Sequence, residues 1–219
     1  MIEFRNVSFA YENQEVIHSL KFKLEDGSFV GILGPNGGGK STFLKLALGI
    51  VKPQSGEIVR SPETIAYLSQ TTSLDDKDFQ CSVEEAVSLG LIQKQKWFLN
   101  REDKAKVKEI LTKFDLWSLR KRLLRDLSGG QLQRVRIAKA LVGDPSLIVF
   151  DEPDAGMDEE NHHRLIHLIE DLHEAGKTIL FVSHHPHDLE TADAIYFIED
   201  GVMLTYAEEL ERGHHHVSL

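Results

Sequence analysis

The apolar positions of this chain fall mostly into short segments of strand length. Near the N-terminus, residues 2–9, 16–24 and 56–68 are apolar or alternate in polarity, and we expect them to form strands of a mostly antiparallel layer. Residues 194–198 and 202–206 are separated by an Asp-Gly pair, which favours a tight turn between two strands. These two segments therefore predict a β-hairpin.

Three continuous apolar runs, at residues 28–33, 147–150 and 178–183, are typical of strands that are buried on both faces. Between the second and third runs, residues 165, 168, 169 and 172 are apolar and share one face of a predicted helix. Buried strands that alternate with helices predict an α/β fold with a largely parallel sheet.

A region of helical period lies between residues 70 and 128. Its clearest part contains Val107, Ile110, Leu111 and Phe114, which fall at i, i+3, i+4 and i+7. We expect this region to form a helical lobe beside the α/β core.

A glycine-rich segment follows the first buried run and fits the pattern G-x-x-x-x-G-K-[ST] at every position. Its glycines allow successive backbone N–H groups to approach a polyphosphate closely. Lys40 supplies a positive charge for the β- and γ-phosphates, and Ser41 offers its hydroxyl to Mg²⁺. Residues 43–49 are expected to form a helix whose N-terminus adds to this anion site. The predicted nucleotide-binding residues of this segment are Gly34, Pro35, Asn36, Gly37, Gly38, Gly39, Lys40, Ser41 and Thr42.

An acidic pair, Asp151 and Glu152, ends the second buried run. Taken alone, such a pair is most simply two solvated acids at the end of a strand. The glycine-rich segment upstream favours a functional role instead. We expect Asp151 to bind Mg²⁺ and Glu152 to polarise or deprotonate the attacking water.

A second anion cradle is predicted just before a helical segment that begins near residue 131. It consists of a hydroxyl, two glycines that permit close backbone approach, and the N-terminus of the helix. In isolation the same residues would be an ordinary helix cap. The residues of this segment, called here the signature turn, are Leu127, Ser128, Gly129, Gly130 and Gln131.

The two cradles and the acidic pair, in this order, make the chain similar to ABC-type ATPases from Tyr11 to about Tyr206. This resemblance implies a P-loop NTPase (RecA-like) core with an antiparallel β layer and an inserted helical lobe. Residues 1–70 and 132–219 would form the core, and residues 71–131 the lobe, of a single domain. It also implies hydrolysis of ATP with Mg²⁺ in a head-to-tail dimer, in which the signature turn contacts ATP bound to the opposite subunit.

Further residues match positions of this family one at a time. Tyr11 matches the aromatic residue that stacks on adenine, and Gln70 matches a glutamine that touches Mg²⁺ or water. Asp158 matches an aspartate at the dimer interface. His184 matches the switch histidine, which holds the γ-phosphate and organises the catalytic carboxylate. His185 departs from the family, in which many relatives carry aspartate at this position. It is a second candidate for the switch, because only the end of the preceding strand fixes the register.

Composition limits the cellular setting and the partners. With 219 residues and 41% apolar content the chain suffices for one compact domain. Its apolar runs are far shorter than the roughly 20 residues of a membrane-spanning helix. The formal net charge of −10 argues against a nucleic-acid partner. The N-terminus shows no signal peptide and the single cysteine, Cys81, has no partner for an internal disulfide, so we expect a reducing cytosol.

The resemblance also implies partners. A membrane permease would hold the chain peripherally at the cytoplasmic face of the inner or plasma membrane. Its coupling helix is expected to dock near residues 71–99, where Phe79, Trp97 and Phe98 either anchor that helix or fill the small core of the lobe. An extracytoplasmic solute-binding protein is the further implied partner.

The transported substrate is the least constrained part of the prediction. The glycine-rich segment, residues 151–158 and the short spacing between Gly56 and Gln70 look like the zinc and manganese uptake branch. We therefore expect uptake of a divalent metal ion. The alternatives are the ATPase of another importer or exporter, or a soluble ABC ATPase that acts on an assembly such as an iron–sulfur scaffold.

Two groups of histidines stand apart from these motifs. Residues 214–216 are three histidines, which match the His-rich ends of some zinc-uptake ATPases or are a casual cluster or tag remnant. His163 and His167 are four apart on a predicted helix, without an adjacent carboxylate or cysteine constellation. We expect this pair to lie on a solvated face.

Overall fold

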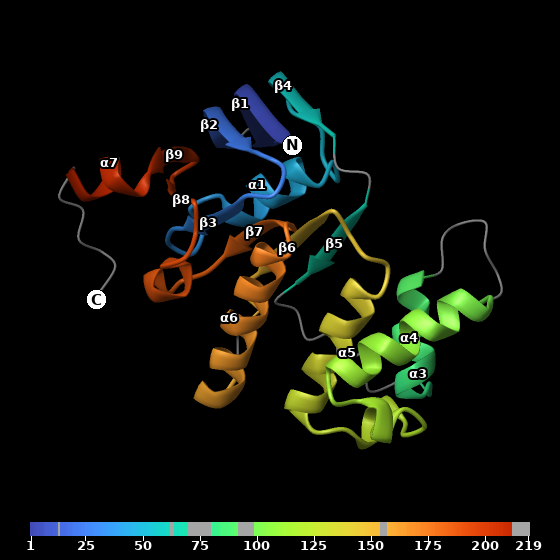
Figure 1. Cartoon of the computed structure of the whole chain (residues 1–219). Helices are drawn as coiled ribbons and strands as arrows, with labels where there is room; N and C mark the ends of the chain where they lie inside the picture. The colour runs from blue at the N-terminus through green and yellow to red at the C-terminus, as the bar shows by residue number, and fades with distance from the viewer. Residues whose placement is uncertain (13, 62–63, 70–79, 92–98, 154–156, 212–219) are drawn as a thin grey trace.

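The computed structural model describes residues 1–12, 14–61, 64–69, 80–91, 99–153 and 157–211. Its strands form a three-stranded antiparallel sheet in the order β2-β1-β4 and a six-stranded sheet in the order β5-β6-β7-β3-β8-β9 (Figure 1). The strands are β1 (Ile2–Tyr11), β2 (Gln14–Leu24), β3 (Phe29–Leu33), β4 (Ser55–Arg60), β5 (Ile65–Leu68), β6 (Leu147–Asp151), β7 (Thr178–Val182), β8 (Ala194–Glu199) and β9 (Val202–Thr205). The α-helices are α1 (Lys40–Ala47), α3 (Val83–Ser88), α4 (Arg101–Lys113), α5 (Gly129–Leu141), α6 (Glu159–Glu174) and α7 (Tyr206–Glu211). The 3₁₀ turns are η1 (Leu89–Leu91), η2 (Trp117–Leu119), η3 (Leu124–Asp126) and η4 (Pro186–Leu189).

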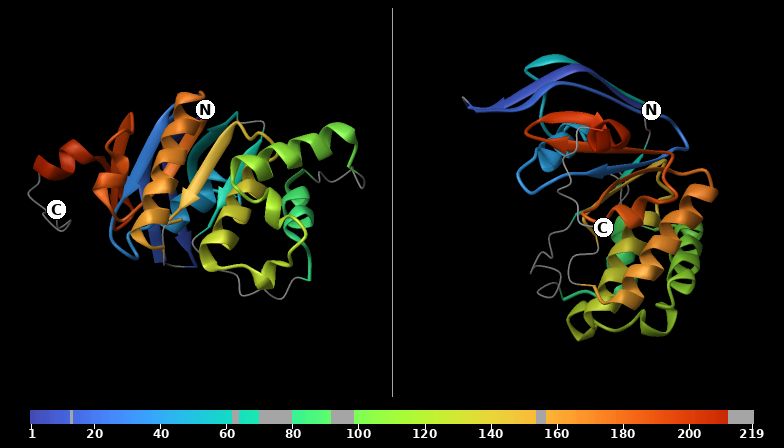
Figure 2. Two further views of the ribbon diagram at one scale, coloured as in Figure 1. Left: turned by 60° about the horizontal axis from the view of Figure 1, so that its bottom comes forward. Right: turned by 90° about the vertical axis from the view of Figure 1, so that its left-hand side faces the viewer.

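The six-stranded sheet lies between two hydrophobic cores. Side chains alternate along a strand, so Val149 of β6 faces the core shared with α1 and the antiparallel sheet, while Ile148 and Phe150 face the core shared with α5 and α6. Figure 2 shows these layers in its right-hand view, with the antiparallel sheet above and α6 below. Burial on both faces explains why the central strands are continuous apolar runs.

The central strands are parallel and therefore end at one edge of the sheet. Strand β7 pairs with β3 on one side and with β6 on the other, and the register aligns Asp151 and Ile32 with the same residue, Val182. The segments that follow these three strands are consequently brought together. They contain the glycine-rich segment, the acidic pair and the predicted switch histidines.

Helix α1 is fixed at its C-terminal end by the antiparallel sheet. The guanidinium of Arg60, in β4, donates hydrogen bonds to the carbonyl oxygens of Ala47 (2.9 Å) and Leu46. These bonds add a side-chain donor to carbonyls at the end of the helix, and they place a positive charge at the negative end of the helix dipole.

Three capping boxes set the starts of helices α3, α4 and α5. In each, the N-cap side chain accepts a hydrogen bond from a backbone N–H three residues on, and the side chain there reaches back to the N-cap N–H. The pairs are Ser82 with Glu85, Asn100 with Asp103, and Ser128 with Gln131. Helices α3, α4 and α5 lie beside the sheets, to the right in Figure 1.

The structure confirms the predicted α/β class, the helices and the C-terminal hairpin. In the hairpin turn, Asp200 and Gly201 have positive φ angles of 45° and 74°, as a tight turn between strands requires. One prediction is wrong: residues 56–68 do not belong to a single layer. Strand β4 pairs with β1, whereas β5 pairs with β6 in the other sheet. The sequence places Pro62 between them, and proline interrupts a strand because it lacks an N–H donor.

Among the described residues, no helix is both long and apolar enough to cross a membrane.

Replacement of Gly90 by alanine should destabilise the contact between η1 and α5. A Cβ at Gly90 would lie 2.0 Å from the carbonyl oxygen of Lys139, and backbone atoms cannot move aside easily. We expect Gly90→Ala to lower the free energy of unfolding by about 1–3 kcal/mol in urea titrations. In the matched Gly129→Ala variant the added Cβ would meet no atom within 4 Å. Equal urea midpoints for both variants would contradict the expectation.

Candidate nucleotide-binding and hydrolysis site

The glycine-rich segment forms a tight loop between β3 and α1. The positive φ angles of Gly34 (147°), Gly37 (83°) and Gly39 (110°) explain why glycine is needed at these positions. A Cβ at Gly34 or Gly38 would lie 2.0 Å or 2.7 Å from the carbonyl oxygen of Ile198, so this side of the loop is pressed against β8. At Gly37 an added Cβ would meet nothing within 4 Å.

The first turn of α1 presents the loop's polar side chains. Lys40 is buried, and its Nζ donates to the carbonyl oxygens of Gly34 (2.8 Å) and Pro35 (3.1 Å). Burial lowers the pKa of Lys40, and nearby Glu152, whose Oε1 lies 3.5 Å from Nζ, acts in the opposite direction. Ser41, the next residue, is exposed. The loop therefore surrounds a buried ammonium group and leaves a hydroxyl accessible beside it.

The acidic pair lies at the end of β6, next to this ammonium group. Glu152 is buried, its N–H donates to the carbonyl oxygen of Val182 (3.0 Å), and its φ angle of 48° is positive. A positive φ is unfavourable for a side chain of this kind and is often found at functional positions. Its Oε1 lies 2.7 Å from Nε2 of His184 and is thus held by two basic groups, His184 and Lys40.

Asp151 has a partner that the sequence analysis did not identify. The hydroxyl of Tyr67, in β5, donates a 2.7 Å hydrogen bond to Oδ2 of Asp151. Burial raises the pKa of Asp151 and the neighbouring charge of Glu152 adds to this, while the Tyr67 bond and Lys40 act against it. The pKa of Tyr67 is raised by burial and by this bond. The sequence could not reveal this bond, because it depends on β5 lying beside β6 in the sheet.

The adjacent histidines take different partners. His184 contacts Glu152, whereas the ring of His185 lies 6.1 Å from the ring of His162 in α6. Nδ1 of His187 lies 2.9 Å from Oε1 of Glu190, within the same turn. In the described residues, no group of three or more His, Cys, Asp or Glu side chains is arranged to hold a metal ion. Among the histidines that the structure describes, His184 is the one that lies against the acidic pair.

The exposed histidines of α6 agree with the predicted solvated face. The side chains of His163 and His167 are 70% and 78% exposed, and each lies near a glutamate of its own helix.

The signature turn lies at the N-terminus of α5 and apart from α1 (Figure 1). Oγ of Ser128 accepts the N–H of Gln131 (3.3 Å), and Oε1 of Gln131 accepts the N–H of Ser128 (3.1 Å). Leu127 is buried, and Gly129 has open space where a side chain would begin. The structure thus brings the glycine-rich loop, the acidic pair and His184 together, and places the signature turn on a different element.

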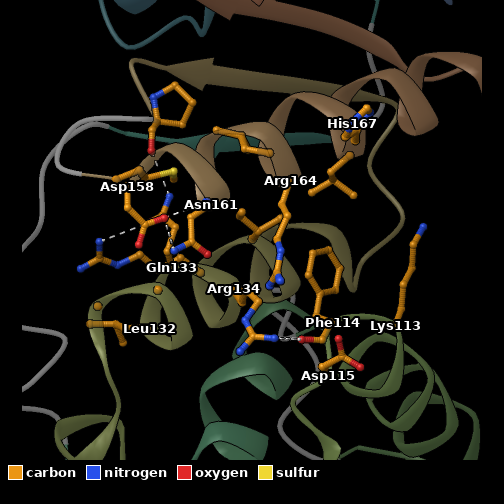
Figure 3. Close-up of a pocket in the computed structure, with 18 of the residues that line it drawn as sticks. Lys113, Phe114, Asp115, Leu132, Gln133, Arg134, Asp158, Asn161, Arg164 and His167 are labelled. Atoms are coloured by element: carbon orange, nitrogen blue, oxygen red, sulfur yellow. Dashed lines mark hydrogen bonds between the residues drawn. The ribbon is translucent and has the colours of Figure 1, made fainter.

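A cleft of about 600 Å³ separates α5 from α6 and adjoins the signature turn. Figure 3 shows Asp158 and Asn161 directed toward each other at one end of it, above Gln133. Oδ1 of Asp158 caps α6 by accepting the backbone N–H of Asn161, and Nε2 of Gln133 donates to the carbonyl oxygen of Pro153 (3.2 Å). The segment after the acidic pair is therefore linked to the helix that follows the signature turn.

Tyr11 ends β1 with an exposed ring. The ring packs edge-on against Phe9 at 4.9 Å between centroids, and Nζ of Lys45 lies 5.7 Å from its centroid. The other predicted residues lie outside the described residues. They are Gln70, Phe79, Trp97, Phe98 and the histidines at 214–216.

Comparisons with known proteins agree with this geometry. A family model described as "ABC transporter" matches residues 17–155. The zinc uptake system ATP-binding protein ZurA of Listeria innocua is 38% identical over 196 residues, which cover 84% of this chain and 76% of that protein. The manganese transport system ATP-binding protein MntB of Bacillus subtilis is 36% identical over 222 residues, which cover 97% of this chain and 86% of that protein.

Solved structures give the same result. A transporter described as being of the metal-chelate ABC type, in an inward-facing conformation, is 30% identical with a TM-score of 0.82, covering 93% of this chain and 81% of that one. A dimeric bacterial ABC transporter cassette is 27% identical with a TM-score of 0.77, covering 92% and 96%. The chain therefore belongs to the ABC transporter family and is one of its ATPase cassettes.

Proposed function

We propose that this chain is the ATPase subunit of an importer for a divalent metal ion, zinc or manganese. The observation that carries the proposal is that similar proteins named for zinc uptake and for manganese transport both align with most of this chain. The family of the chain and the similarity to a metal-chelate type transporter support the same substrate class.

Hydrolysis is assigned to the residues gathered at the edge of the six-stranded sheet. Lys40 binds the β- and γ-phosphates, and the backbone N–H groups of residue 34 and residues 36–42 surround the polyphosphate. Glu152 accepts a proton from the attacking water or polarises it. The 2.7 Å contact between Nε2 of His184 and Oε1 of Glu152 supports a role for His184 in holding that carboxylate. Tyr11, whose ring is exposed at the end of β1, stacks on adenine.

Mg²⁺ fits the oxygen groups beside the loop. Asp151 and Ser41 offer a carboxylate and a hydroxyl, which are the hard ligands that Mg²⁺ takes in nucleotide sites. Burial raises the pKa of Asp151, which means that the surroundings do not fully compensate the negative charge of its carboxylate. A cation bound there would favour the charged form. When bound, Mg²⁺ neutralises phosphate charge. Gln70, the third predicted ligand, lies outside the described residues.

The remaining assignments concern partners. Residues 127–131 and Asp158 contact the opposite subunit of an ATP-bound head-to-tail homodimer, and the known dimer of a similar cassette supports this. A permease docks near residues 71–99 and holds the chain at the cytoplasmic face of the membrane. A solute-binding protein delivers the metal ion from outside.

Asp151→Asn should stabilise the free protein while it removes activity. The folded-state pKa of Asp151 is raised, so its ionised form destabilises the fold above that pKa, and the penalty fades as pH falls through it. Without nucleotide or Mg²⁺, we expect a higher Tm than wild type at pH 7 and a smaller difference in acid. ATP hydrolysis should fall at least about a hundredfold. A lower Tm at pH 7 would show that the carboxylate is well compensated.

Glu152→Gln should retain ATP binding and lose turnover by about a hundredfold or more, because the amide cannot accept the water proton. ATP and Mg²⁺ should then trap a dimer, which light scattering after size exclusion can detect. Glu159→Gln is the matched control, since the Glu159 side chain is 94% exposed in the first turn of α6. Undiminished hydrolysis in Glu152→Gln would overturn the assignment.

Deletion of the encoding gene should reduce cellular uptake of radioactive zinc or manganese, and the wild-type chain but not Glu152→Gln should restore it. Unchanged uptake of both ions would refute the metal substrate.

The Glu152→Gln protein, purified with ATP and Mg²⁺ from gently solubilised membranes, should bring with it a polytopic permease, which mass spectrometry can identify. A purely soluble companion would favour an assembly ATPase.

A further inference from the structure

Three buried or half-buried polar side chains connect α6 to the segment around His184. Oδ1 of Asp188, in η4, lies 2.7 Å from Nε2 of His162 in α6. Its other oxygen, Oδ2, accepts a 2.7 Å hydrogen bond from Oγ of Ser183, which directly follows β7. Ser183 is completely buried and Asp188 nearly so. Both oxygens of a buried carboxylate are thus engaged, as burial of a charge requires.

This network holds the backbone on both sides of His184. Ser183 precedes His184, and the N–H of His185, which follows it, donates a 2.9 Å hydrogen bond to Oγ of Ser183. The Ser183 hydroxyl in turn is oriented by Asp188. The direction in which the His184 side chain leaves the backbone therefore depends on the network, and so does its 2.7 Å contact with Glu152.

The network reaches Asp158, the N-cap residue of α6. The backbone N–H of His162 donates to the carbonyl oxygen of Asp158 (3.0 Å), and the Asp158 side chain caps the helix. His162 thus contacts Asp158, the predicted dimer-interface residue, through its backbone, and Asp188 through its ring. The neighbouring His163 is exposed and pairs only loosely with Glu159 of its own helix, at 3.9 Å.

We propose that His162 is a positioning residue for ATP hydrolysis: through Asp188 and Ser183 it ties the first turn of α6 to His184. The position of Asp158, which the opposite subunit contacts in the dimer, then sets how His184 is oriented toward Glu152. The inference rests on the proposed roles of Glu152, His184 and Asp158. It adds a path by which dimer closure sets the catalytic geometry.

The test begins with His162→Phe, which keeps a planar ring and removes the bond to Asp188. We expect kcat for ATP to fall about tenfold, because a hydrogen bond to a buried charge is lost, with KM and nucleotide affinity within about twofold of wild type. In the Glu152→Gln background the ATP-dependent dimer should still form. His162→Gln, which retains an N–H donor, should recover much of the lost kcat, and His163→Phe should match wild type.

Coupling between His162 and Asp158 is tested by a double-mutant cycle that combines His162→Phe with Asp158→Ala. If both act through one path, the double variant should lose little more kcat than the more damaging single variant. Losses that simply multiply, or a His162→Phe enzyme with wild-type kcat, would overturn the proposal.

A further variant keeps the test decisive if His162→Phe does not fold. Ser183→Ala removes the hydroxyl and should lower kcat with unchanged nucleotide affinity, whereas full activity in Ser183→Ala would refute the path. Failure of the underlying assignment is recognised separately, since Glu152→Gln would then hydrolyse ATP at the wild-type rate.

Discussion

Parallel pairing of β6, β7 and β3 is the constraint on which the rest of the structure depends. It aligns the ends of three strands, so that segments distant in sequence meet at one edge. The register is enforced from both faces, because a slip of one residue would move Phe150 and Val149 into each other's cores. The packing of the two cores therefore fixes the positions of the polar side chains at the edge of the sheet.

Without a ligand, the conformation and burial of the polar groups at that edge lower the stability of the folded protein. Lys40 is buried with its ammonium group turned to loop carbonyls, Glu152 has a positive φ, and the pKa of Asp151 is raised by burial. Each of these features costs free energy without a ligand. A polyphosphate and a cation would supply the missing charges, so binding and stability are linked at this site.

The sequence predicted the elements whose signal is local. Continuous apolar runs gave the central strands, the Asp-Gly pair gave the hairpin, and the spacing around Lys40 gave the loop. It did not predict that β5 leaves the antiparallel layer, because hydrophobic pattern does not say which sheet a strand joins. Tyr67 and His162 were missed for the same reason: their partners, Asp151 and Asp188, are distant in sequence and become neighbours only through strand order and helix packing.

The glycine-rich loop rests on a part of the chain that is made long after it. Gly34 and Gly38 lie against the carbonyl oxygen of Ile198, and the N–H of Gly201 donates to the carbonyl oxygen of Gly38 (3.1 Å). During synthesis the loop is complete in sequence long before the β8–β9 hairpin leaves the ribosome. A nascent chain of that length lacks the surface that shapes the loop, so the geometry of the nucleotide-binding loop depends on strands that are synthesised about 160 residues after it.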